Sequence, residues 1–293
     1  MKNQALGMSN AKVGFFQGEQ ALVLTGLLGF VLAALCAVWV LIWGGEVAPD
    51  GDVTKAISFN AALGAFILST AAIIPLSGLG EKGRAFFRRF YVILALYSYG
   101  AETVQNMRGV NPRFVKDGSA FDYAVGNLFA LVALLLVVVY LYLAVQFFKS
   151  RAYALRPELN VGIRYAMVAV VISFAAGIWI SMNQGRTTGL EGNIIWLHGL
   201  GFHALQVMPL VAWLAERSPK APHVRRRGIH ITGIAYVLGL LAIGWQTWNG
   251  DAVMEVSVLP LVAGFCFLVT IAVGALMLRR AAAPASRTAQ WGS

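Results

Sequence analysis

Three polar side chains, Glu102, Gln105 and Arg108, lie in a largely apolar stretch of the sequence and are the first candidates for chemistry. Their spacing of three residues places them along one side of a helix. A carboxylate in hydrocarbon is costly, so such residues mark functional sites. Glu102 is therefore a candidate catalytic residue, as a proton relay, or a candidate metal ligand. The alternative is a structural ion pair with Arg108, Arg186 or a protonated histidine, or a carboxyl kept neutral by burial.

A second polar group contains His198 and His203, followed by Gln206. Imidazole is a common ligand of heme iron and of transition metals. On an ideal helix a spacing of five turns the two rings ~140° apart. Either a π-bulge aligns them on one ion, or they face different partners, including a hydrogen-bond acceptor on a neighbouring helix. Gly199 and Gly201 leave room for a flat cofactor or for another helix.

The composition points to a membrane protein. Hydrophobic residues make up 58% of the 293 residues and charged residues 12%, and the mean hydropathy is +0.69. These values exclude a disordered chain, a disulfide scaffold and an ordinary soluble enzyme. Cys36 and Cys266 both lie in apolar runs, which argues against a disulfide framework or a cysteine-rich metal site. Motifs of nucleotide hydrolases, zinc proteases and serine hydrolases are absent from the sequence.

Eight segments are long and apolar enough to cross a bilayer, since about 20 residues at 1.5 Å each span the hydrocarbon. We therefore predict an all-α, single-domain transmembrane bundle over residues 1–293. The predicted spans are 21–43, 56–76, 86–107, 121–148, 161–182, 194–215, 229–248 and 256–278.

The basic residues predict the orientation of these spans. With both termini in the cytoplasm, 18 of the 23 Lys and Arg residues fall on the inner side, whereas nine of 13 acidic residues fall on the outer side. This asymmetry is the positive-inside pattern of a bacterial inner-membrane protein. The net charge of +10 is thus explained by topology, and we expect no nucleic-acid partner. Arg225, Arg226 and Arg227 are interpreted as a topology anchor that faces anionic lipid.

Most of the polar residues within spans then lie in the outer half of the membrane. Glu102 is 13 residues beyond Arg89, or ~20 Å along the helix. His198 and His203 are ~7 Å and ~15 Å deep in the sixth span. Arg186, in the outer loop before that span, is expected to cover the Glu102 cluster. The inner half has few polar residues beyond Ser and Thr, so we expect it to be chemically plain.

Two motifs carry a resemblance to known sequences. Residues 102–109 contain Glu-x-x-Gln-x-x-Arg-Gly, and residues 198–210 contain His-x4-His-x2-Gln-x2-Pro-Leu. Both resemble patterns of an uncharacterised family of bacterial multi-pass inner-membrane proteins. That family often has His at the position of Arg113, so this chain lacks one ligand that a three-histidine metal site would use. The resemblance implies no activity.

The sequence therefore predicts an outward-facing intramembrane polar site. The leading hypothesis is a redox protein that holds heme or a transition-metal ion through His198, His203 and Glu102. The remaining cofactor-binding candidates, which would orient these ligands, are Gln105, Arg108, Arg186 and Gln206. The first rival is a small-solute transporter or ligand-binding receptor that uses the same pocket. The second is a structural subunit of a membrane complex, in which the polar cluster only fixes helix packing. The lipid bilayer is the expected environment in each case.

Overall fold

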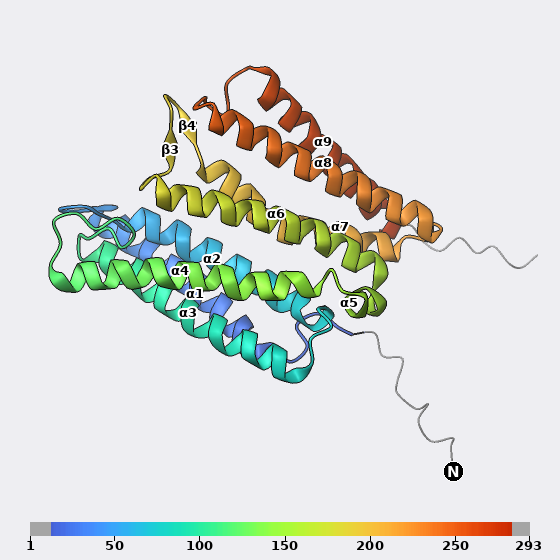
Figure 1. Ribbon diagram of the computed structural model, residues 1–293, viewed down its shortest axis with the longest axis horizontal. Coiled ribbons are helices and arrows are strands. Elements are labelled where there is room, and N and C mark those ends of the chain that lie inside the picture. Colours follow the sequence, from blue (N-terminus) through green and yellow to red (C-terminus); the bar gives the residue numbers. More distant parts are fainter. Residues whose placement is uncertain (1–12, 283–293) are drawn as a thin grey trace, which may run out of the picture.

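The computed structural model describes residues 13–282 as a bundle of helices (Figure 1). The long helices are α1 (Gln20–Trp43), α2 (Val53–Ile73), α3 (Glu81–Met107), α4 (Ala120–Gln146), α6 (Pro157–Met182), α7 (Ile195–Arg217), α8 (Pro222–Trp248) and α9 (Val258–Ala282). A 3-10 turn that contains Pro75 (Ile74–Leu76) extends α2, and a short helix α5 (Ser150–Leu155) links α4 to α6. The prediction of an all-α bundle is thus confirmed.

Seven of the helices in the described part of the chain are long and apolar enough to cross a membrane. The long helix outside this set is α3, which has 27 residues and carries the charges of residues 81–89 and Glu102. Helices α3, α6 and α8 begin four to seven residues earlier than the predicted spans. Polar residues occupy these first turns, and a hydropathy pattern does not detect a helix that continues beyond the hydrocarbon.

Two small β-hairpins were not expected from the sequence. Strands β1 (Glu46–Val47) and β2 (Gly51–Asp52) pair between α1 and α2, and β3 (Thr187–Thr188) and β4 (Gly192–Asn193) pair between α6 and α7. Both hairpins lie at the left of the bundle in Figure 1, which we call the hairpin end. The opposite end carries most of the arginines and lysines, and we call it the basic end.

The helices form two groups that meet along a limited contact. The first group is α1–α4 and the second is α6–α9, and Figure 1 shows them as a lower and an upper layer. Packing is dense within each group, chiefly between α1 and α2 and between α6 and α7. Between the groups, α2 packs on α7 and α4 packs on α6. The chain thus folds as two four-helix layers with a shared seam.

Glycines let α1 and α2 approach to backbone contact. A Cβ atom on Gly26 would lie 3.0 Å from the carbonyl oxygen of Gly64, and one on Gly64 would lie 2.7 Å from the carbonyl oxygen of Gly26. One turn further along α1, a Cβ on Gly29 would lie 2.3 Å from the hydroxyl of Tyr99 in α3. Small residues at such crossings are typical of membrane helices, whose association depends on close packing.

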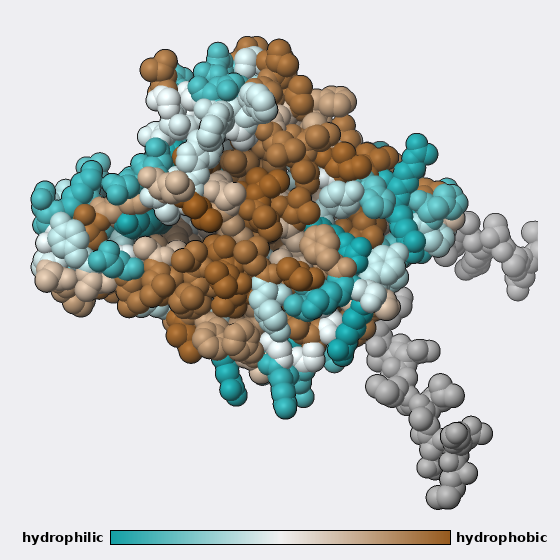
Figure 2. Space-filling view, in the orientation of Figure 1, coloured by the Kyte–Doolittle hydropathy of each residue, from teal (hydrophilic) through white to brown (hydrophobic). Residues whose placement is uncertain are grey.

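The outer surface of the bundle matches a bilayer. Large apolar side chains are exposed along every long helix except α2, among them Leu41, Leu131, Leu241 and Phe265. Figure 2 shows apolar side chains over the middle of the visible face and hydrophilic side chains at the hairpin end and the basic end. An apolar surface of this extent is stable only in contact with lipid or with another protein.

We predict that Gly29→Ala destabilises the protein by roughly 1–3 kcal/mol, because the new methyl group overlaps Tyr99 and the backbone of α2. The matched control is Gly100→Ala, since a Cβ on Gly100 meets nothing within 4 Å and alanine favours the helix. The free energy of unfolding in detergent micelles measures both. Equal effects of the two substitutions would contradict the close approach of α1 to α3.

Candidate functional site

The buried carboxylate of Glu102 is held by Arg113. The Arg113 Nη2 atom is 2.7 Å from Glu102 Oε1, and its Nε atom is 3.1 Å from Oε2, so the guanidinium binds both carboxylate oxygens. Glu102 is 1% exposed, whereas the Arg113 side chain is 35% exposed and lies over the ring of Phe59. A forked pair of this kind is the strongest way to compensate a buried carboxylate.

Arg113 can bind Glu102 because the chain turns sharply after α3. Gly109 has a φ of +81°, and a Cβ there would lie 1.9 Å from the carbonyl oxygen of Ala48. Only glycine fits this conformation and this contact. The turn brings residues 110–119 back over the end of α3, which carries Arg113 to Glu102. The partners expected from the sequence were Arg108, Arg186 or a protonated histidine. Arg113 was not among them, because it lies outside the helical periodicity.

The β1–β2 hairpin is fastened to the same corner. The side-chain amide of Asn106 donates to the backbone oxygen of Glu102 at 2.7 Å, and its carbonyl accepts from the Asp52 N–H at 3.0 Å. Burial alone would raise the pKa of the Asp52 carboxyl, but hydrogen bonds from Thr54 and the nearby Lys55 ammonium outweigh burial and hold this pKa below its usual value. Asp52 also accepts from the Thr54 N–H and so caps α2.

Gln105 and Arg108 belong to a separate network. The amide of Gln105 donates to Asp122 at 3.0 Å, and the guanidinium of Arg108 donates to the same carboxylate at 2.9 Å. Arg108 also donates to the Gln105 side chain. Asp122 in turn accepts from Ser119 in the capping box that begins α4. These residues join α3 to α4, and Asp122 was not predicted as part of the site.

His198 lies at the crossing of α7 with α6. Its Nδ1 atom is 2.8 Å from the backbone carbonyl of Ser173, and the Ser173 hydroxyl donates to the carbonyl of His198. Gly177 makes room for the ring, since a Cβ there would lie 2.9 Å from His198 Cε1. The Nδ1–H group donates to a fixed carbonyl, so Nε2 carries the lone pair, and it has no hydrogen bond within the described residues.

The neighbours of His203 differ from those of His198. It is exposed on the surface of α7, and its Nδ1 atom is 3.3 Å from the side chain of Gln206. Gln206 reaches across the seam to the Ser69 hydroxyl of α2, at 2.7 Å. Helix α7 is α-helical from Ile195 to Arg217, without a π-bulge. The two imidazoles therefore serve different partners, and Gly201 faces α6 rather than a cofactor-sized space.

Four aromatic rings fill the middle of the seam between the two groups. Phe66 of α2 lies 4.8 Å from Tyr140 of α4 and 4.7 Å from Phe202 of α7, measured between ring centroids. Phe174 of α6 lies 5.5 Å from both Tyr140 and Phe202. The ring of His198 continues the cluster, 4.7 Å from Phe202. We call Phe66, Tyr140, Phe174 and Phe202 the aromatic seam.

The predicted site residues thus form four sets. Glu102 is bound to Arg113, and Gln105 and Arg108 are bound to Asp122. His198 faces α6, and Gln206 bonds to α2 with His203 beside it. Arg186 is exposed before β3 and has no ion pair within residues 13–282. Those residues contain no group of three His, Cys, Asp or Glu side chains placed to hold a metal ion.

The basic end is richer in ion pairs than the sequence suggested. The buried carboxylate of Glu19 pairs with Arg84 at 2.6 Å and with Arg88 at 3.1 Å, which ties the start of α1 to α3. In the second group, Glu158 pairs with Arg225 at 3.1 Å and Glu216 pairs with Arg156. The expectation of a chemically plain inner half overlooked these pairs, because each joins residues about 60 or more positions apart.

Comparison with known proteins adds no identity. No protein-family model, no curated protein and no solved structure matches this chain.

We predict that Arg113→Met destabilises the protein by roughly 2–3 kcal/mol, because it leaves the Glu102 carboxylate buried without an ionic partner. The double substitution Glu102→Gln with Arg113→Met removes the unpaired charge and restores more than half of this loss. Chemical unfolding in detergent micelles measures both. The control is Lys116→Met, an exposed cation in the same loop. A double variant no more stable than Arg113→Met would contradict the pairing.

Proposed function

We propose that the chain is an eight-span protein of the bacterial inner membrane with both termini and the basic end in the cytoplasm. Helix α3, with 27 residues, is ~40 Å long and sufficient to cross a bilayer as the eighth span. Within residues 13–282, 15 of the 20 Lys and Arg residues belong to the basic end. Trp43, Trp196, Trp245 and Trp248 are exposed toward the hairpin end, as expected for an interfacial belt.

We further propose that this protein binds a small solute between its two helix groups, as a transporter or a ligand-binding receptor. The carrying observation is that the groups meet at the aromatic seam, while Arg113 belongs to the first group and His198 to the second. Figure 2 shows the surface hollowed between the β3–β4 hairpin and the loops of the first group. Binding sites between helix groups, flanked by polar side chains, are typical of membrane transporters.

The chemistry of Arg113 indicates the class of solute. The Glu102 carboxylate is buried, whereas a third of the Arg113 side chain is exposed, so the positive charge is the accessible part of the pair. Phe59 supplies an apolar face beside it. A small molecule with a carboxylate or another anionic group and an apolar body would match these features.

A distance measurement between the groups tests the proposal. Spin labels at Lys116→Cys and Leu190→Cys report on the two exposed loops at the hairpin end, in a Cys36→Ala, Cys266→Ala background. For a transporter we expect two distance populations, because the groups tilt about the aromatic seam. The control pair, Leu190→Cys with Met254→Cys, lies within the second group, where Gly189 contacts Gly250, and should give one narrow population. A single narrow distance for both pairs, together with no solute binding, would favour a structural subunit of a membrane complex.

A second candidate function is supported by His198. Its Nδ1–H group donates to the Ser173 carbonyl, which orients the ring and leaves the Nε2 lone pair for a ligand. Histidines that bind heme iron or a transition-metal ion are commonly fixed in this way. A heme- or metal-binding redox protein would use His198 as its ligand, with Glu102 and His203 outside direct coordination.

Titration of the purified protein with hemin, and separately with Co²⁺, tests this second function. If His198 is the ligand, a Soret band or a cobalt ligand-field spectrum appears in the native protein and is lost in His198→Ala. His203→Ala is the matched control, because it removes an imidazole from the same helix without touching Ser173. Identical spectra for both variants, or no spectrum with the native protein, would refute ligation by His198.

A further inference from the structure

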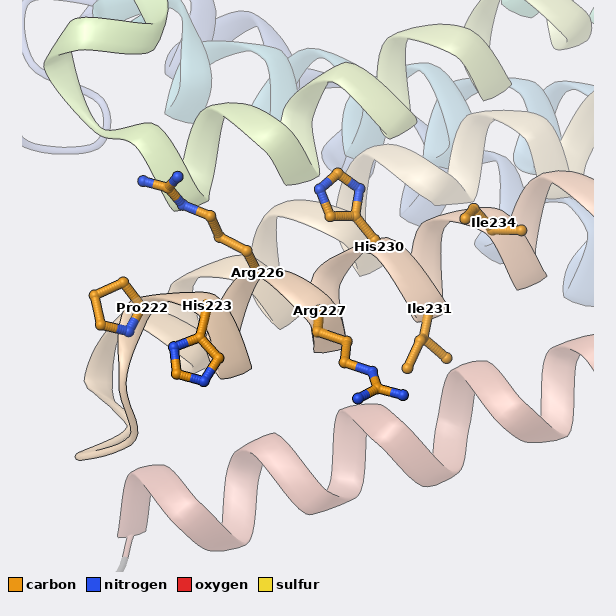
Figure 3. A pocket seen from close by; sticks show the side chains of 7 residues that line it. All are labelled: Pro222, His223, Arg226, Arg227, His230, Ile231 and Ile234. Carbon is orange, nitrogen blue, oxygen red and sulfur yellow. The ribbon is translucent and has the colours of Figure 1, made fainter.

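A cationic pocket lies at the start of α8, at the basic end of the second group. It has a volume of about 760 Å³ and is lined by Pro222, His223, Arg226, Arg227, His230, Ile231 and Ile234. Figure 3 shows Arg226 and Arg227 extending to opposite sides of α8, with His223 between them near the end of the helix and His230 further along. The hydroxyl of Tyr165 on α6 is 3.0 Å from His230 Nδ1, so this ring is held in place.

The two arginines of the pocket have no acidic partner. Their neighbour Arg225 pairs with Glu158, but Arg226 and Arg227 form no ion pair within residues 13–282. The Nε atom of Arg226 is buried and has no hydrogen-bond partner within the part of the chain that the structure describes. Two neighbouring cations without a counter-charge favour an anionic ligand.

An apolar stripe continues from these charges along the same face of α8. Starting at His223 and Arg227, steps of three and four residues lead to Ile231, Ile234, Leu238, Leu241 and Trp245. This spacing keeps the side chains on one side of a helix. Each of these five apolar residues is at least 41% exposed. The surface therefore changes from cationic to apolar in the direction that runs from the basic end into the bundle.

We propose that this face of α8 is a binding site for an anionic phospholipid. The phosphodiester of the headgroup contacts Arg227 and His223, and an acyl chain lies along Ile231, Ile234 and Leu238. Arg226 adds positive charge from the neighbouring side of the helix. Basic pockets beside membrane helices bind anionic headgroups in this way, on the side where such lipids and positive loops meet. The inference requires only that α8 spans the membrane, and it does not depend on what binds between the two helix groups.

Native mass spectrometry of the purified full-length protein with added phosphatidylglycerol or phosphatidylcholine tests the site. We expect selective retention of phosphatidylglycerol, and an apparent affinity about 30-fold weaker in the double variant Arg226→Gln, Arg227→Gln, because two cations near an anionic headgroup are lost. The matched control is Lys82→Gln, Arg89→Gln, which removes two exposed cations from the same end of the first group. It should bind phosphatidylglycerol as the native protein does.

Thermal unfolding in micelles separates a lipid from a soluble phosphate compound. Phosphatidylglycerol should raise the melting temperature of the native protein and of the control variant, and not that of the double arginine variant. Inorganic phosphate and glycerol 3-phosphate at the same concentration should have no such effect, because they lack the acyl chain that contacts α8. The proposal is overturned by equal retention in both double variants, or by the absence of a preference over phosphatidylcholine. It is also overturned by full displacement of the lipid with inorganic phosphate.

Discussion

The burial of one carboxylate governs how the hairpin end is built. Glu102 is 1% exposed within a helix that packs against α1 and α2, and it is stable there because Arg113 binds both of its oxygens. This pairing requires the chain to reverse just beyond α3, which Gly109 permits. The reversal also places Asn106 and Gly51 in contact and thereby fixes the β1–β2 hairpin. The need to pair the buried Glu102 carboxylate therefore links Arg113, the turn at Gly109 and the β1–β2 hairpin.

The contact between the two helix groups is of a different kind. Within each group, glycines bring backbones together, as between α1 and α2 and between α6 and α7. Across the seam, large rings meet instead. Within the described residues, one hydrogen bond joins α2 to α7, between Gln206 and Ser69.

The two ends of the molecule use charge in different ways. At the hairpin end, acidic residues are satisfied by arginines close in sequence, as in Glu102 with Arg113 and Asp122 with Arg108. At the basic end, ion pairs link residues that are far apart, and cations still remain in excess. Arg226 and Arg227 belong to this excess. In a bilayer, an anionic headgroup is the counter-charge that such residues meet.

The sequence by itself determined the class of the protein, because an apolar helix satisfies its own backbone and its residues alone decide that it prefers lipid. It also identified Glu102, His198 and Gln206 as polar residues that need partners. Which partners they have was decided by tertiary structure. Arg113 reaches Glu102 through a turn that no helical period describes, and His198 reaches Ser173 through a crossing of two helices. Contacts between distant residues depend on how helices pack, and a local pattern of residues does not contain that information.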